Sequence, residues 1–116
     1  MFKTMVTAIF MTIMLIGCTT VMSVKTDNAT KEYAPTKKKD VQVYVTADAG
    51  REYIPVAEIV AMADANEDSE KVVNLLKAES AEYGADAIVN LRFEFGYGYW
   101  TNGLKGYATA VKFTNK

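Results

Sequence analysis

Few residues in this chain could do chemistry, and histidine is absent altogether. The chain of 116 residues carries one thiol, Cys18, so it lacks the imidazole and thiolate ligands from which zinc and copper sites are usually built. The Ser-His and Cys-His pairs of hydrolases are excluded for the same reason. The sequence therefore predicts no zinc or copper site and no catalytic nucleophile of these types.

Carboxylates are the remaining candidates for chemistry. Four of them cluster before and at the start of a predicted helix: Asp64, Glu67, Asp68 and Glu70. Their oxygens suit a hard cation, but the run lacks the spacing and central glycine of an EF-hand loop, and acids at a helix start also complement the helix dipole. Glycoside hydrolysis needs two acids across one cleft, and nothing in the sequence brings Glu52, Asp86 and Glu94 together. We expect no metal, no cofactor and no enzymatic activity.

Residues 66–95 hold the elements around which the fold is organised. Apolar side chains recur there at helical spacing, namely Val72, Leu75, Leu76 and Tyr83. We expect Asn66 or Asp68 to cap the helix start, and Gly84 to end the helix in the left-handed conformation. Asp86 is expected to bond the turn backbone. The period then becomes two, which predicts a strand whose buried face carries Val89, Leu91, Phe93 and Phe95.

Three further strands are predicted at residues 41–46, 53–63 and 107–113, with residues 96–106 as a glycine and aromatic loop. Two strands, a helix and two more strands indicate the α+β class. The expected architecture is a small ββαββ sandwich in which one helix packs on a short mixed sheet, after a signal peptide and a flexible tether.

Two motifs in this domain resemble a known family. Gly84-Ala-Asp-Ala-Ile-Val89 after an amphipathic helix, and Gly106-Tyr-Ala-Thr-Ala-Val-Lys-Phe113 at the end, are similar to the YbjQ-like family, often catalogued as heavy-metal-binding. That family shares a related fold with the RcsF-type envelope-stress lipoproteins. The resemblance covers residues 40–113, marks Gly84 and Asp86 as a structural motif, and implies oligomers, since YbjQ-like proteins form rings. RcsF-type sensors keep disulfides in the folded domain, whereas this chain with its single cysteine can form none within itself.

Residues 1–17 are predicted to be a lipoprotein signal peptide. Lys3 gives a positive start, and the apolar run of residues 5–16 is shorter than the ~20 residues that a spanning helix needs. Leu15-Ile16-Gly17-Cys18 resembles the bacterial lipobox, whose cysteine is acylated and becomes the new N-terminus. A secretory signal with an incidental cysteine is the alternative, but an odd cysteine in an exported protein then stays unexplained.

Residues 18–39 are predicted to be a lipid-anchored flexible tether, because they are rich in Thr, Ser, Lys, Asp and Asn and lack apolar periodicity. Lys37, Lys38 and Lys39 at its end either touch anionic headgroups or belong to a solvated linker. The folded domain is expected over residues 40–116. Thr19 stands where an aspartate would favour inner-membrane retention in enteric-type bacteria, which indicates the outer membrane, facing the periplasm.

The aromatic loop is the distinctive surface feature of the sequence. Its predicted partner-binding residues are Tyr97, Tyr99, Trp100, Leu104 and Tyr107. The same aromatics could instead cover a sheet edge or pack against a second copy. With 13 basic and 14 acidic side chains, the charge gives no argument for nucleic acid. Two hypotheses follow: a bacterial envelope lipoprotein with a non-catalytic binding or sensing domain that contacts another envelope protein or a wall polymer, or a membrane-anchored, self-assembling ring module.

Overall fold

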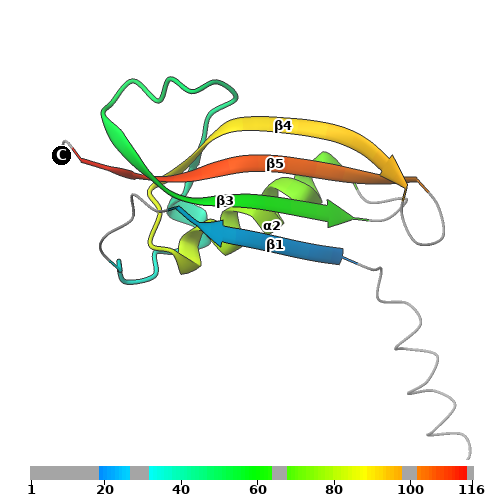
Figure 1. The fold of residues 1–116 in the computed structure, drawn as a ribbon, viewed down its shortest axis with the longest axis horizontal. Coiled ribbons are helices and arrows are strands. Elements are labelled where there is room, and N and C mark those ends of the chain that lie inside the picture. The colour runs from blue at the N-terminus through cyan, green and yellow to red at the C-terminus, as the bar shows by residue number, and fades with distance from the viewer. Residues whose placement is uncertain (1–18, 27–31, 64–67, 98–101, 115–116) are drawn as a thin grey trace, which may run out of the picture.

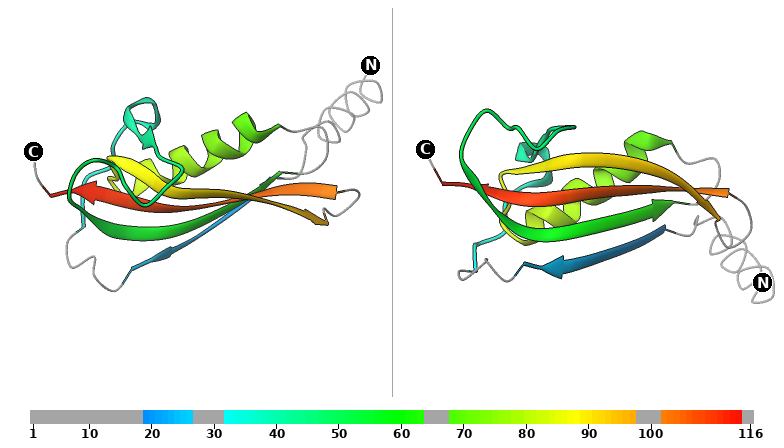
Figure 2. Two further views of the ribbon diagram at one scale, coloured as in Figure 1. Left: turned by 90° about the horizontal axis from the view of Figure 1, so that it is seen from above. Right: turned by 45° about the horizontal axis from the view of Figure 1, so that its top comes forward.

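The computed structural model describes residues 19–26, 32–63, 68–97 and 102–114. Its elements in chain order are β1 (Thr19–Lys25), the 3-10 turn η1 (Lys38–Asp40), β2 (Gln42–Val43), β3 (Tyr53–Ala63), α2 (Ser69–Glu82), β4 (Ala87–Tyr97) and β5 (Asn102–Phe113). The strands form one sheet in the order β1-β3-β5-β4-β2, in which β2 and β4 pair in parallel and the other neighbours antiparallel. Helix α2 lies across one face of this sheet (Figures 1 and 2). The predicted α+β class, with one helix on a mixed sheet, is confirmed.

The helix begins and ends as its sequence predicts. Asp68 is the N-cap residue, and its carboxylate accepts a hydrogen bond of 3.0 Å from the backbone N–H of Lys71. At the other end Gly84 has φ 73°, and its N–H donates to the carbonyl of Ala81. The N–H of Ala85 donates to the carbonyl of Ser80, which completes a Schellman motif. The left-handed glycine at position 84 is therefore confirmed.

The main core lies between α2 and the sheet. Val72 and Leu76 of the helix are fully buried and pack with Ile59 of β3 and with small residues of β3 and β5. One of these small residues is Gly106, where a Cβ atom would collide with Val72. Because glycine and alanine stand at this contact, the helix can approach the sheet closely. The predicted apolar face of the helix is confirmed, with Leu75 and Tyr83 at its half-buried margin.

The predicted tether is wrong for most of its described residues. Thr19–Lys25 forms the edge strand β1, which pairs antiparallel with β3 from Thr19 opposite Ala63 to Lys25 opposite Ala57. Ser23 fixes β1 to the helix, because its hydroxyl donates to Glu79 at 2.7 Å and lies 2.8 Å from the hydroxyl of Tyr83. The described domain thus begins at Thr19 and not near Asp40. Two of the four polar residues of β1 are threonines, which β-sheets accommodate well, so its polar composition does not prevent a strand.

The predicted strand over residues 41–46 is mostly absent. Only Gln42–Val43 pairs as a strand, with Ala87 and Ile88 of β4. Val41 is buried, but Val43 is exposed and Val45 is 70% exposed, so the expected buried valine face does not form. Beyond Val43 the chain stays beside β4 through backbone hydrogen bonds of Tyr44 with Ile88 and Leu91 and of Thr46 with Asn90.

Strand β4 contains a bulge that the alternating pattern does not predict. Between Val89 and Arg92 the register with β5 shifts, and Asn90 has φ 56°. A bulge adds one residue and so exchanges the faces of the strand beyond it. Val89 therefore packs in a second cluster with Val111 and Phe113, whereas Leu91 packs under the helix. The predicted common buried face of Val89, Leu91, Phe93 and Phe95 is wrong, and Phe95 is 88% exposed.

The predicted eleven-residue loop is largely a β-hairpin. Strand β4 extends to Tyr97 and β5 starts at Asn102, with Phe95 opposite Leu104 and Gly96 opposite Gly103. Only residues 98–101 join the two strands, and they lie outside the described residues. Glycines indicated a loop, but at these positions they are paired within strands. The alternation predicted for β5 from Tyr107 to Phe113 is confirmed.

Candidate functional site

Some of the acids considered for chemistry, and the buried Ser80, have structural partners. Asp68 caps the helix, and the Ser80 hydroxyl donates to the carbonyl of Leu76 at 2.7 Å. Asp64 and Glu67 lie outside the described residues. Asp86 and Glu94 belong to opposite ends of β4, so no carboxylate pair of the kind used in glycoside hydrolysis forms between them.

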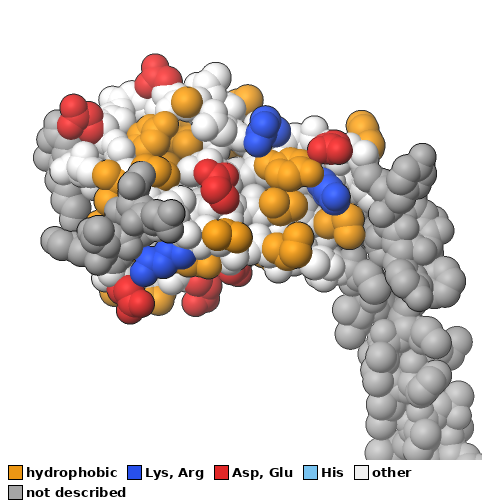
Figure 3. Space-filling model, in the orientation of Figure 1, with side chains coloured by type: hydrophobic (Ala, Val, Ile, Leu, Met, Phe, Trp, Pro, Cys, Tyr) orange, Lys and Arg blue, Asp and Glu red, His pale blue; other side chains and the backbone are white. Residues whose placement is uncertain are grey.

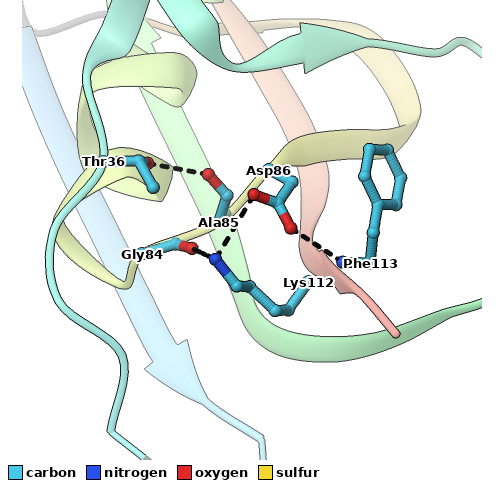
Figure 4. Close-up of polar contacts among 6 residues, drawn as sticks. All are labelled: Thr36, Gly84, Ala85, Asp86, Lys112 and Phe113. Atoms are coloured by element: carbon cyan, nitrogen blue, oxygen red, sulfur yellow. Dashed lines mark hydrogen bonds and ion pairs between the residues drawn. The ribbon is translucent and has the colours of Figure 1, made fainter. Parts of the chain in front are cut away.

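The Gly84-Asp86 motif holds together three parts of the fold (Figure 4). Asp86 accepts hydrogen bonds from the backbone N–H of Phe113 at 2.9 Å and from the Lys112 ammonium at 3.3 Å. That ammonium also donates to the carbonyl of Gly84, and the Thr36 hydroxyl donates to the carbonyl of Ala85. The prediction that Asp86 bonds its own turn is wrong, since its partners lie on β5. Both carboxylate oxygens of Asp86 and the carbonyls of Gly84 and Ala85 are bonded within the fold, so these contacts are structural.

The side of the sheet away from α2 contains the candidate binding surface, here called the open face. Directly opposed residues of paired strands project to the same side. Ile59, Ala61 and Ala108 pack under the helix, so their neighbours Val60 and Tyr107 project to the open face. Five apolar residues lie on the part of this face that residues 44–52 do not cover, and together they are called the open-face patch: Met22 and Val24 of β1, Val60 and Met62 of β3, and Tyr107 of β5.

The open-face patch is bordered by charges of both signs. Figure 3, which looks onto the open face, shows apolar side chains gathered between basic and acidic ones. The charged residues that the strand register places on this side are Glu58, Arg92, Glu94 and Lys105. The Arg92 guanidinium lies 5.6 Å from the centre of the Tyr107 ring, and the Thr109 hydroxyl donates to Glu58 at 2.7 Å. Two shallow hollows meet at Arg92, one lined by Phe93, Glu94 and Tyr107 and the other by Glu58, Asn90 and Thr109.

Among the described residues, one end of the open face is covered by other side chains and the other end, here called the bare end, is exposed to solvent. At the covered end, Val89, Val111 and Phe113 form a second apolar cluster with Ala49. The Arg51 guanidinium lies 4.3 Å from the centre of the Phe113 ring. Residues 44–52 therefore cover this end, whereas Met22 is 63% and Val24 is 70% exposed at the bare end.

Tyr107 gives a measurable signature of this surface. A hydrogen bond to Glu94, loss of water contact and the charge of Glu94 raise the pKa of Tyr107 above 10.0, against an opposing effect of Arg92. The interaction with Glu94 therefore contributes stability below pH 10, and the contribution is lost as the pH rises through the raised pKa. We expect Glu94→Gln to lower the Tyr107 pKa, measured by an NMR titration of its ring carbons. Glu58→Gln, on the same face but bonded to Thr109, should leave that pKa unchanged; equal effects would contradict the assignment.

The predicted partner-binding residues do not form one surface. Tyr107 lies on the open face, whereas Leu104 packs beside the helix core on the opposite side of β5. Tyr97 is in β4, and Tyr99 and Trp100 lie outside the described residues. The lipobox residues Leu15, Ile16, Gly17 and Cys18 also lie outside them. Sequence reasoning missed Met22, Val24, Val60 and Met62, because only the strand pairing shows that they are neighbours.

The described residues contain neither a candidate membrane-spanning helix nor a candidate metal cluster. No helix among them is long and apolar enough to span a membrane. Residues 19–26, 32–63, 68–97 and 102–114 also contain no group of three or more acids, histidines or cysteines placed to hold a metal ion.

The fold and the bare apolar face define the class as a small α+β domain with a candidate protein-binding surface. No family model matches the chain. A UPF0145 protein of Bacillus velezensis is 42% identical to it over 64 residues, which is 54% of this chain and 58% of that protein's length. This similarity supports the resemblance to the UPF0145, or YbjQ-like, family. The chain thus spans a little over half of its relative.

A solved structure supports the fold. The crystal structure of a Francisella virulence factor, FvfA, superposes with a TM-score of 0.55 and 17% sequence identity, over 78% of this chain and 97% of that one. At this identity the likeness concerns the arrangement of helix and strands alone. Neither comparison bears on the RcsF-type relationship.

Proposed function

We propose that this chain is a UPF0145-type, lipid-anchored protein of the bacterial envelope whose domain is a non-catalytic binding module. The lipobox-like Leu15-Ile16-Gly17-Cys18 supports the anchor, with Cys18 as the acylated residue. Two or more acyl chains hold a protein stably at a membrane. Thr19 after the cysteine supports the outer membrane, facing the periplasm. Strand β1 starts one residue after Cys18, so an anchor there would hold the domain close to the bilayer.

The observation that carries the binding function is the open-face patch. Its apolar centre, with Met22 and Val24 largely exposed, is bordered by two acidic and two basic side chains. An apolar centre inside a polar rim is the usual anatomy of a protein–protein interface. A wall polymer would call for a polar, hydrogen-bonding groove at the centre. Of the two partners expected from the sequence, the open face therefore favours another envelope protein.

Val24 and Val45 allow a matched test of this surface, because both are valines that are 70% exposed and only Val24 belongs to the open-face patch. We expect a photo-crosslinking residue at position 24 to give a discrete protein adduct in intact cells, and the same residue at position 45 to give none. Val24→Glu should weaken the captured complex by about 2 kcal/mol or more, roughly thirtyfold in affinity. Adducts of equal yield from both positions would contradict the proposal. Intact mass spectrometry of the membrane fraction tests the anchor, which an unmodified Cys18 would exclude.

Self-assembly is the second candidate, and one observation favours it. Within the described residues β1 has no strand on its outer side, and β4 has none beyond Leu91 on the side of β2. Unpaired strand edges can extend a sheet from one copy to the next. The native mass of the detergent-solubilised protein separates the two functions: a discrete oligomer supports a ring, and a monomer supports a tethered binder.

A further inference from the structure

The start of β1 and the outer part of the β4–β5 hairpin lie at the same end of the sheet, here called the hairpin end (Figures 1 and 2). Thr19 pairs with Ala63, Ala63 with Leu104, and Leu104 with Phe95, so these residues form one row across four strands. Strands β4 and β5 continue for two more residue pairs, to Tyr97 and Asn102. At about 3.3 Å per residue, the hairpin extends roughly 7 Å past the level of Thr19. The chain before Thr19 therefore joins the domain beside a protruding hairpin.

The described residues at this end expose aromatic surface. Phe95 is 88% exposed, the largest fraction among the large apolar side chains in the described part of the chain, and Phe93 is 44% exposed. Both project to the helix side of β4, since their partners Leu104 and Gly106 do. Nothing in the fold of the described residues buries Phe95. A side chain this exposed is available for contact with a partner outside the described residues.

The two charged side chains at the hairpin end have opposite signs, so they do not favour a partner of either charge. Glu94 and Lys105 are directly opposite each other in the row next to Phe95. Across the sheet, Thr19 and Phe95 are separated by three strand spacings, or roughly 14 Å. An apolar partner that meets both the chain before Thr19 and Phe95 must therefore present a broad surface. A bilayer presents such a surface, and the proposed acyl anchor at Cys18 places it next to Thr19.

We propose that the hairpin end rests on the surface of a lipid bilayer, with Phe95 and Phe93 as aromatic contacts in the headgroup region. Phenylalanine is among the residues that form the apolar face of segments bound at the boundary between headgroups and acyl chains. The direction of approach rests on the proposed function, because the anchor at Cys18 brings the bilayer to Thr19. The two contacts, at Thr19 on β1 and at Phe95 on β4, lie toward opposite edges of the sheet and hold its strands at a steep angle to the membrane. The open face then stands across the membrane plane, accessible to a protein partner from the side.

Lys37, Lys38 and Lys39 cannot share this contact. Thr36 bonds the carbonyls of Ala81 and Ala85 at the C-terminal end of α2, and η1 follows directly. That end of the helix is next to the start of β4, eight residues before Phe95. In the proposed orientation the lysines belong to the end of the domain that faces away from the bilayer, so they take no part in the headgroup contact.

The full-length protein, reconstituted into phosphatidylcholine vesicles, provides the test. Trp100 is the sole tryptophan and lies in the sequence between Tyr97 and Asn102, so its fluorescence reports on the hairpin end. We expect its emission to be blue-shifted and quenched by phosphatidylcholine brominated along the acyl chains. Because the contact is aromatic and not ionic, adding phosphatidylglycerol should change the quenching little. Phe95→Ser should reduce the quenching clearly, whereas Val45→Ser, at an apolar position on another segment that is 70% exposed, should not.

Each contrary result has a definite meaning. Emission that stays red-shifted and unquenched in vesicles overturns the proposal, as does a Phe95→Ser variant that is quenched like Val45→Ser. A blue shift without quenching by brominated lipid would mean that the hairpin end contacts protein and not lipid. Quenching that requires anionic lipid would mean that the contact is electrostatic. Either result also overturns the proposal. The intact mass of the same sample separates this inference from the anchor. Quenching with an unmodified Cys18 supports the bilayer contact and excludes the lipid anchor. An acylated Cys18 without quenching supports the lipid anchor and excludes the bilayer contact.

Discussion

Gly84→Val should unfold the domain at a much lower urea concentration than the unchanged chain. Gly84 has φ 73°, a region in which a β-branched residue is strained by about 1–3 kcal/mol. A Cβ atom there would also lie 2.5 Å from Tyr33 Cβ and 2.6 Å from the carbonyl oxygen of Ala34. Forcing extra atoms into such a contact typically costs a further 1–3 kcal/mol or so. The expected loss is a large part of the ~5–15 kcal/mol that stabilises a typical domain.

Gly50 is the matched control for this substitution. Its φ is 71°, nearly the same, but nothing lies within 4 Å of a Cβ atom at that position. Gly50→Val should therefore show the strain alone, and the difference between the two urea midpoints measures the contact of residues 33–34 with the helix end. Equal midpoints would mean that this segment does not rest on Gly84.

The features predicted correctly are those that depend on neighbouring residues. The helix is specified by the spacing of Val72 and Leu76, by the cap at Asp68 and by the stop at Gly84, all within one stretch of sequence. Strand β3 likewise follows from a continuous apolar run, and its bounds, Tyr53–Ala63, are those predicted. In these elements local preference and tertiary packing agree.

The features that were missed depend on partners far away in the sequence. Strand β1 reads as a polar linker, yet its seven residues pair with β3 almost forty positions later. The bulge at Asn90 is not visible in the alternating pattern, although asparagine is one of the few residues that tolerate a positive φ. The bulge places Val89 on the face opposite Leu91, whereas Phe93 and Phe95 do share the helix side with Leu91 but remain exposed there.

The candidate site illustrates the same limit. Tyr107 was selected from the sequence as part of an aromatic loop, and it belongs to the open face for a different reason, its position in β5 opposite Val60 and Arg92. Met22 and Val60 become neighbours only through the pairing of β1 with β3. A binding surface assembled from four strands is specified by register, and register is set by the whole sheet.

The second large effect is expected at Gly106, where the helix comes closest to the sheet. A Cβ atom there would collide with Val72 Cγ1 and lie 3.1 Å from Leu76 Cδ1. Both side chains are fully buried and have little room to move. Gly106→Ala should therefore cost about 1–3 kcal/mol by overpacking. Val72→Ala should cost roughly 2 kcal/mol by removing two buried methyl groups and leaving a cavity.

The two changes together should cost less than their sum, because the shortened side chain at position 72 makes room for the new methyl group. We expect a compensating coupling energy of about 1 kcal/mol or more, within the range found for residues in contact. Phe93→Ala provides the control, since Phe93 Cε1 would be 3.7 Å from the new Cβ atom, an ordinary contact distance. That substitution should not rescue Gly106→Ala. Urea unfolding of the three single and two double variants measures both couplings, and strict additivity of Gly106→Ala with Val72→Ala would mean that the helix is free to shift away from the sheet.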